Sequence, residues 1–560
     1  MKKRIGWVLT FIVIAVGAFA IPAKRTPFTV TNSDGTVLTL IMCGDESYHF
    51  YTTTDGIPVV MQENGDYRLA PELKDEITST WTRRSKRRSA HRTRRAMKHL
   101  EYDYDNYFKG TKKGIVILVN FKNLSMKSAN TNDAFYAQFN EQGYSKNNHY
   151  GSVHDYFYDQ SYGQLDLTFD VFGPVTVSQN YAYYGGNNSE GVDKRTAKLA
   201  AEACKLADQK YDINWADYDW DGDKEVDQVY IIYAGYGENA GASTSTIWPH
   251  EWTLSDGVNY GDGDGAIKLD GCTIDTYAMS CELRGTSGST MNGMGTACHE
   301  FSHCLGFPDY YDTSYEGGFG MSYWDVMDGG SYSGASGWGE QPCGFTSHER
   351  MMAGWLTPTE LSSPAVVTDM PALQDEPVAY IILNDGNENE YFLLENRQNK
   401  GWFQYVGASN MCHGMLVIHV DYDEDAWYNN EPNIEAKHQR MSIIPANKTF
   451  GTLKGASGDK QWETTPTQLR GQLFPGYNGV DELTDESHPS HGVRLFNKNT
   501  DGSYLMQKPI TGIAESADGL ISFNFMGGSD DVTPKPGPSN KITIKDIADL
   551  IEEYLNQTDE

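Results

Sequence analysis

Residues 299–309 have the sequence HEFSHCLGFPD, and this stretch decides what fold to expect around it. His299 and His303 are four residues apart, so on a helix both imidazoles project from one face, one turn apart. Such a pair can share one Zn²⁺ through ring nitrogens. Thr296 suits the start of that helix, and Gly306 suits its end because glycine readily adopts positive φ.

The chain is expected to turn back toward the metal after this helix. Pro308 prevents the helix from continuing, so the turn comes just after His303. Asp309 then reaches the same ion as a third ligand and leaves the fourth position for water. Asp312 and Glu316 are weaker candidates for the third ligand.

Glu300 supplies the acid–base group that this chemistry needs. Bound Zn²⁺ lowers the pKa of a water molecule from ~15.7 to ~7 and polarises a carbonyl. Glu300 lies about 100° around the helix from His299, close enough to take the proton of that water and deliver it to a leaving amine. The five residues HEFSH alone also fit an ordinary amphipathic helix; Gly306 and Asp309 favour the metal site.

The stretch resembles the immune-inhibitor-A-like (M6) metallopeptidases, which are zinc endopeptidases of the metzincin type. Their pattern HExxHxxGxxD is met in full across 299–309, and residues 324–330 (WDVMDGG) resemble their Met-turn. The resemblance implies that Met327 forms a hydrophobic floor under the metal, a structural role that a thioether suits. It covers roughly residues 25–525. His250 and His419 lie in other matching stretches and are expected to pack rather than to bind metal.

Length, charge and the N-terminus set the broad class. At 560 residues the chain is expected to hold more than one domain. A net charge of −31 disfavours nucleic acid as a partner, and eight Cys are too few for a disulfide scaffold. Residues 1–20 combine a basic start, an apolar run and Ala18-Phe19-Ala20, which predicts a secretory signal peptide rather than a retained anchor. No later segment is apolar for long enough to span a bilayer.

Composition shifts divide the rest of the chain. Nine basic and no acidic residues between Arg83 and Lys98 predict a protease-sensitive hinge that ends a pro-segment. The predicted parts are the signal peptide 1–20, the pro-segment 21–98, a zinc metallopeptidase catalytic domain 99–355, a β-sandwich-like domain 356–530, a Pro/Gly/Ser-rich linker 531–540 and an amphipathic tail 541–560. The tail weakly resembles half of a dockerin-type module, which would give it a cell-surface partner; a packing helix fits it equally well.

The fold class is predicted to be α+β, with a twisted sheet and an active-site helix in a zincin- or metzincin-like catalytic domain. Residues 114–121 and 229–234 are apolar, β-branched runs that indicate strands buried on both faces. Residues 192–209 predict a helix whose alanine stripe packs closely on a sheet. After about residue 355, short alternating strands separated by turns favour the β-sandwich-like domain.

A second cation site is predicted in the acidic stretch 217–227. Carboxylates at alternate positions, with Gly222 in the sixth place, suit a hard cation such as Ca²⁺. The predicted ligands are Asp217, Asp219, Asp221, Asp223 and Asp227. The bidentate Glu that ends an EF-hand is missing, and an acidic, solvated turn is the alternative.

The cysteines raise three hypotheses. The thiolate of Cys43, in the pro-segment, could block the zinc as a cysteine switch, although a buried free thiol is favoured. Cys272 and Cys281 could form a disulfide, which spacing does not settle. Cys298 and Cys304 flank the two histidines and are expected to pack.

Together these features predict a secreted, zymogen-type zinc endopeptidase acting on protein or peptide substrates. The alternative is an inactive zincin-like module that serves binding or adhesion. The intact Glu300 argues against that alternative, because a mere metal scaffold has no need of a base there.

Overall fold

The computed structural model describes residues 21–24, 27–45, 48–62, 64–74, 77, 107–188, 191–456, 459–487 and 504–528. The predicted signal peptide 1–20, the basic run 83–98, the linker 531–540 and the tail 541–560 lie outside the described residues. Within the described part of the chain, no helix has both the length and the apolar character needed to cross a bilayer.

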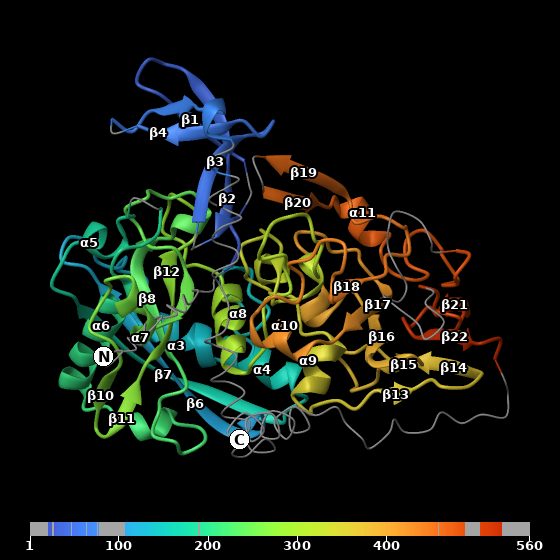
Figure 1. Cartoon of the computed structure of the whole chain (residues 1–560). Helices are drawn as coiled ribbons and strands as arrows, with labels where there is room; N and C mark the ends of the chain where they lie inside the picture. The colour runs from blue at the N-terminus through green and yellow to red at the C-terminus, as the bar shows by residue number, and fades with distance from the viewer. Residues whose placement is uncertain are drawn as a thin grey trace, which may run out of the picture.

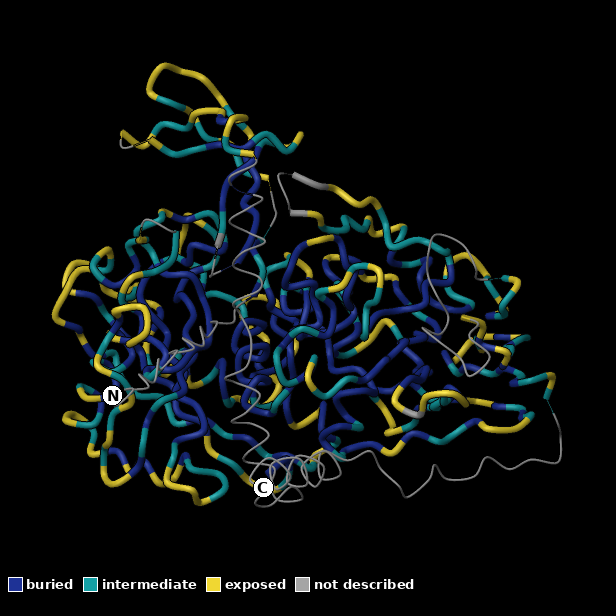
Figure 2. The backbone as a smooth tube through the Cα atoms, viewed as in Figure 1, coloured by how far each residue is buried: buried dark blue, intermediate teal, exposed yellow. Residues whose placement is uncertain are grey.

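The N-terminal part is an antiparallel meander that projects from the body of the molecule (Figure 1). Its strands are β1 (Phe28–Thr31), β2 (Val37–Asp45), β3 (Tyr48–Thr53), β4 (Pro58–Met61) and β5 (Tyr67–Leu69), followed by a short 3₁₀ turn, η1 (Pro71–Leu73). The outer loops are exposed, whereas β2 and β3 run down into the buried part of the molecule (Figure 2). This meander therefore docks through its two longest strands.

A five-stranded sheet forms the centre of the next part, in the order β7-β6-β8-β12-β9. Its strands are β6 (Gly110–Asn120), β7 (Leu165–Thr176), β8 (Val229–Tyr236), β9 (His250–Thr253) and β12 (Thr276–Leu283). Four strands are parallel, and only the edge strand β9 pairs antiparallel. The two apolar runs predicted as buried strands are β6 and β8, and Ile115 to Val119 are fully buried.

Helices cover both faces of this sheet, as a parallel sheet requires. One face packs on α6 (Thr196–Tyr211), whose Ala197, Ala200, Ala203 and Ala207 lie in the core. The other face packs on α3 (Asn132–Asn140), α4 (Val153–Gln160) and α8 (Gly295–Cys304). The helix predicted at 192–209 therefore exists, but it begins and ends later than predicted.

Shorter elements connect these layers. They are η2 (Lys146–Asn148), α5 (Tyr181–Gly185), η3 (Trp215–Tyr218), η4 (Glu238–Ala240), α7 (Leu254–Asn259), β10 (Ile267–Leu269), β11 (Cys272–Ile274), η5 (Ser322–Trp324), η6 (Gly329–Tyr332) and α9 (Ser347–Met352).

The C-terminal half is built on two sheets, ordered β13-β15-β16-β17-β18 and β14-β22-β21. Their strands are β13 (Thr359–Glu360), β14 (Ala365–Met370), β15 (Tyr380–Asn384), β16 (Asn387–Arg397), β17 (Gly414–Asp421), β18 (Met441–Ile443), β21 (Ile510–Glu515) and β22 (Ile521–Phe525). The remaining elements are η7 (Gly401–Phe403), α10 (Glu424–Tyr428), the hairpin β19 (Thr452–Ala456) and β20 (Asp459–Glu463), and α11 (Pro466–Arg470). Both sheets contribute side chains to one hydrophobic cluster.

The opposite face of the larger C-terminal sheet packs against the part that holds α8. Leu393 of β16 and Ile418 of β17 belong to the same hydrophobic cluster as Phe301 of α8. The mixed α/β architecture agrees with the predicted class. The metzincin-like and β-sandwich-like assignments, and the domain boundary at 355/356, stay predictions.

Candidate metal centre

Helix α8 carries His299, Glu300 and His303, and all three side chains are buried. The helix begins at Gly295, where a Cβ would lie only 1.8 Å from the carbonyl oxygen of Ser331 in η6. Glycine thus lets α8 pack directly against the segment that follows the Met-turn. Gly306 has φ +78°, the left-handed conformation expected just beyond the helix end.

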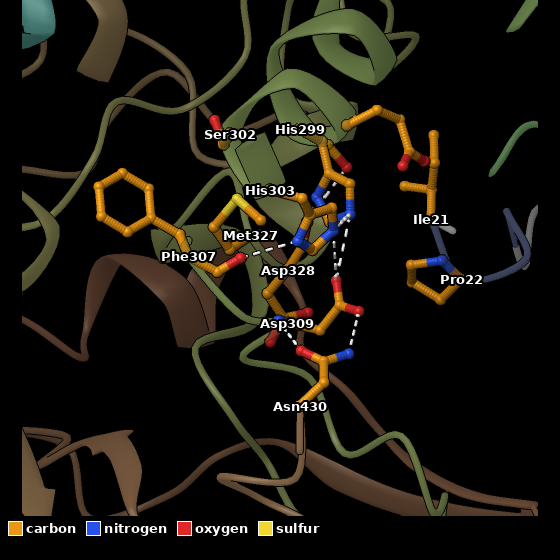
Figure 3. Close-up of polar contacts among 12 residues, drawn as sticks. Ile21, Pro22, His299, Ser302, His303, Phe307, Asp309, Met327, Asp328 and Asn430 are labelled. Atoms are coloured by element: carbon orange, nitrogen blue, oxygen red, sulfur yellow. Dashed lines mark hydrogen bonds and ion pairs between the residues drawn. The ribbon is translucent and has the colours of Figure 1, made fainter. Parts of the chain in front are cut away.

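Asp309 lies against both imidazoles (Figure 3). Its Oδ1 is 3.1 Å from Nε2 of His299 and 3.5 Å from Nε2 of His303, and the two Nε2 atoms are 3.3 Å apart. The structure therefore brings together the three residues that the sequence predicted as ligands. Asp312 does not join them, because its carboxylate accepts hydrogen bonds from the backbone of Gly317 and Gly318.

Backbone carbonyls fix which nitrogen of each imidazole faces Asp309. Nδ1 of His299 lies 2.7 Å from the carbonyl oxygen of Val326, and Nδ1 of His303 lies 2.7 Å from that of Phe307. A carbonyl oxygen only accepts, so both Nδ1 atoms carry hydrogen, and neutral rings present lone pairs at Nε2. Two lone pairs and a carboxylate then converge, an arrangement that needs a positive charge at its centre. This donor set fits Zn²⁺.

The pKa shifts of the trio formed by His299, His303 and Asp309 also favour a bound cation. Burial would raise the pKa of Asp309, but the neighbouring His303 and His299 outweigh it and hold that pKa well below its ordinary value. Burial would lower the pKa of His299, but Asp309 and Glu300 outweigh it and raise that pKa. The Asp309 carboxylate and the histidine rings thus stabilise each other's charged forms. A bound cation would take the place of the proton on the imidazole.

One further residue of this site, Asn430, was not predicted from the sequence. Its Nδ2 donates to Oδ2 of Asp309 at 2.7 Å, and its Oδ1 accepts from the backbone N–H of Asp309 at 2.5 Å (Figure 3). Asn430 lies 121 residues further along the chain, just after α10, in a stretch without a recognisable motif. Only tertiary contact identifies it.

Met327 lies beside the histidines and is fully buried (Figure 3). Its backbone N–H donates to Asp325 at 2.7 Å, and its carbonyl accepts from Tyr310 at 2.9 Å. Asp328, the next residue, accepts from the backbone of Met321 and Ser322. The turn around Met327 is thus fixed by buried carboxyl groups on both sides.

Ile21 and Pro22 lie across the site from the histidines (Figure 3). Trp248 donates through Nε1 to the carbonyl of Ile21 at 3.3 Å, and the Tyr332 hydroxyl donates to that of Pro22 at 2.9 Å. Burial is the main cause that raises the pKa of Tyr332, and nearby Glu300 adds to it. The Tyr332 phenol therefore stays protonated and donates to the carbonyl of Pro22.

Cys43 does not join the trio. It lies in β2, buried, with its sulfur 3.7 Å from the hydroxyl of Thr52. This position does not support the cysteine-switch hypothesis and agrees with the buried thiol that was favoured. Ile21 and Pro22, from the predicted pro-segment 21–98, are instead drawn across the site from the histidines (Figure 3).

The remaining cysteines and histidines follow the structural expectations. All eight cysteines are buried thiols that form no disulfide, so Cys272 of β11 and Cys281 of β12 are not bridged as was considered. His250 contacts the carbonyl of Trp248, and His419 pairs with Glu390 in the C-terminal sheet.

Of the five predicted calcium ligands, three come together. Asp219, Asp221 and Asp223 can offer oxygens to one cation. Asp217 instead lies 3.1 Å from the ammonium of Lys113. Asp227 accepts hydrogen bonds from the Tyr107 hydroxyl and from a backbone N–H. The calcium site stays a prediction, and the structure groups three of its five carboxylates.

Comparison with known proteins agrees with this geometry. A family model described as "Immune inhibitor A peptidase M6, catalytic domain" matches residues 108–355. Pre-pro-metalloprotease PrtV of Vibrio cholerae serotype O1 (strain ATCC 39315 / El Tor Inaba N16961) is 29% identical over 270 residues, which cover 41% of this chain and 28% of the relative. Immune inhibitor A of Bacillus thuringiensis subsp. alesti is 30% identical over 216 residues, 35% of this chain and 30% of the relative.

A third relative is a putative secreted metallopeptidase of Arthroderma benhamiae, 25% identical over 237 residues, which cover 36% of this chain and 32% of the relative. The chain thus spans less than a third of the length of these curated relatives. The matched family model includes α8, Asp309 and the turn around Met327. Residues 108–355 of this chain thus match the catalytic domain of the immune inhibitor A (M6) family of metallopeptidases, and the similar relatives include a metalloprotease and an immune inhibitor A.

Proposed function

We propose that this chain is a secreted, zinc-dependent endopeptidase that hydrolyses protein or peptide substrates. The observation that carries the proposal is the convergence of His299, His303 and Asp309 beside the buried carboxyl of Glu300. Zn²⁺ bound by the trio would activate water and polarise the scissile carbonyl.

Glu300 is the proposed general base and acid. It accepts the proton of the attacking water and then donates it to the nitrogen of the leaving amine, so the peptide bond breaks without a free strong acid or base. Met327 is assigned a structural role beneath the histidines. An inactive binding or adhesion module is the alternative, but such a module would not need a base at position 300.

The proposal includes a zymogen form and secretion. Ile21 is fully buried and lies across the site from His299 (Figure 3), which supports residues 21–98 as a pro-segment that covers the metal site. Two relatives are named as a pre-pro-metalloprotease and a putative secreted metallopeptidase, which supports export. Asp219, Asp221 and Asp223 are the proposed calcium ligands. A surface partner for the tail stays a prediction.

The central test is the Glu300→Ala variant. The protein is cleaved in its basic run 83–98 with trypsin, trypsin is then inhibited, and hydrolysis of casein is followed. We expect Glu300→Ala to retain stoichiometric zinc and to lose at least ~10²-fold in rate. A chelator should abolish the activity of the unmodified enzyme, and added Zn²⁺ should restore it.

Glu316→Ala is the matched control. Glu316 is an exposed carboxylate of the loop that follows Asp309 and lies outside the trio, so its removal should leave the rate within about twofold. Undiminished cleavage by Glu300→Ala would show that another group moves the proton. Zinc binding without any hydrolysis by the unmodified protein would favour the binding module.

A further inference from the structure

The side chain of Asn430 contacts Asp309 at two points. Its amide nitrogen donates to carboxylate Oδ2 at 2.7 Å, while its amide oxygen accepts from the backbone N–H of the same aspartate at 2.5 Å. Both side chains are buried, Asn430 with 4% of its surface exposed and Asp309 with none. Hydrogen bonds at buried positions have well-defined geometry, because water does not compete for the same groups.

The two oxygens of the Asp309 carboxylate have different partners. Oδ1 faces the two imidazole nitrogens, and Oδ2 faces Asn430. A carboxylate held at one oxygen and at its own backbone has little freedom to rotate about its side-chain bonds. The oxygen that faces the metal position is therefore fixed before an ion arrives, which reduces the ordering cost of binding.

The backbone around Asn430 suits this role. Asn430 has φ +57°, in the left-handed region that asparagine tolerates better than most residues. Its own N–H bonds to the carbonyl of Trp427, at the end of α10. The amide is thus directed at Asp309 by the way α10 ends.

The same loop fastens the chain that follows Asp309. Asn433 donates to the carbonyl of Tyr310 at 2.7 Å, and Gln439 accepts from the backbone N–H groups of Phe319 and Gly320. Asn430 contacts Asp309 itself, whereas Asn433 bonds to the backbone of Tyr310 and of Met441. This difference provides a matched pair of positions.

We propose that Asn430 is a positioning residue for the metal site and that the C-terminal half of the chain thereby completes that site. Asn430 lies outside residues 108–355, which the family model matches. The inference deepens the proposed function and rests on it for the identity of the metal. Its test measures metal binding, so the outcome does not depend on whether the protein cleaves peptides.

The experiment compares Asn430→Gly with Asn433→Ala in the full chain. Both carry Glu300→Ala, so that the chain does not cut itself during the measurement. Glycine keeps the positive φ and removes both hydrogen bonds to Asp309. Zinc is titrated against a chromophoric chelator, and the absorption spectrum of the Co²⁺-substituted protein reports the ligand geometry. Thermal unfolding of the metal-free proteins records the structural cost of each change.

We expect Asn430→Gly to weaken Zn²⁺ binding about 10–100-fold and to alter the Co²⁺ bands. Asn433→Ala should lower the unfolding temperature but keep zinc affinity within about threefold and the Co²⁺ spectrum unchanged. Unaltered affinity and spectrum in Asn430→Gly would overturn the proposal. Equal loss of affinity in Asn433→Ala would also overturn it, because general loosening of the loop would then explain both.

The isosteric variant Asn430→Asp covers the case in which Asn430→Gly fails to fold. It keeps the acceptor for the Asp309 N–H but places a carboxylate oxygen where the donor was, 2.7 Å from Oδ2. We expect an altered Co²⁺ spectrum, and an unchanged spectrum would count against the proposal.

Discussion

Individual side chains determine the chemistry of the site through the groups behind them. His299 and His303 each use Nδ1 to reach a backbone carbonyl, which leaves Nε2 for the metal position. Their partners, Val326 and Phe307, contribute only main-chain carbonyls. The side chains at these two positions therefore do not reveal the role in the sequence. Asp309 differs, because its outer partner is a side chain, that of Asn430.

Met327 gives a prediction at this scale. Replacing Met327 by Leu keeps a buried apolar side chain of similar volume and removes the sulfur, so we expect a stability cost below ~1.5 kcal/mol and zinc affinity within about threefold. Denaturant unfolding and a zinc titration check the two expectations. Met327→Ala should instead cost ~2–5 kcal/mol through the cavity it leaves. Loss of zinc in Met327→Leu would mean that the sulfur contacts the ion.

At the level of secondary-structure elements, helix α6 shows why a helix can begin later in the chain than its sequence predicts. Its first residue is Thr196, and its N-cap residue Arg195 provides no side-chain cap. The carboxylate of Asp262, from a distant loop, accepts the backbone N–H groups of Ala197 at 2.7 Å and Lys198 at 3.0 Å. Burial raises the pKa of Asp262 to about 6 despite these bonds. A remote residue thus caps the helix.

Removing this cap should destabilise the protein. We expect Asp262→Ala to lower the free energy of unfolding by about 1–2 kcal/mol, because two N–H groups of α6 lose their acceptor. Asp264→Ala, an exposed change in the same loop, should alter it by less than ~0.5 kcal/mol. Urea unfolding measures both variants, and equal effects would show that the loop rather than the cap matters.

At the scale of the whole molecule, the N-terminal meander and the body share buried polar contacts. His49 of β3 lies 2.9 Å from Glu238 of η4 and stacks on Trp248 with ring centroids 4.6 Å apart. Burial would lower the pKa of His49, but Glu238 and the carbonyl of Asp45 outweigh it, and the pKa is raised. The pKa of Lys24 shifts in the opposite direction, because burial lowers it to about 7.

The His49–Glu238 pair predicts a pH-dependent attachment of the meander. A raised pKa means that the stabilisation is fully present below the ordinary value of ~6.5 and is lost as pH rises through the folded-state pKa. His49→Gln should therefore weaken attachment by roughly 1–3 kcal/mol at pH 6 and by less at alkaline pH. Comparing each variant with the unmodified chain at the same pH removes the contribution of Lys24.

Hydrogen exchange of β2 and β3 in the Glu300→Ala chain measures that attachment. Arg68→Gln is the control, since the Arg68–Glu72 pair is exposed and lies within the meander. A difference between His49→Gln and the unmodified chain that stays constant from pH 6 to pH 9 would show that protonation of His49 plays no part.

The local features of this protein could be predicted from residues that are close together in the chain. Spacing along a helix put His299 and His303 on one face, glycine chemistry ended that helix at Gly306, and apolar runs marked β6 and β8, because each of these depends on residues close in the chain. The contacts between residues that are distant in the chain became known only from the tertiary structure. Asn430 bonds to Asp309, Asp262 caps α6, and Trp248 bonds to Ile21. Each of these contacts joins residues more than sixty positions apart, and such contacts follow from packing of the whole core rather than from any local pattern.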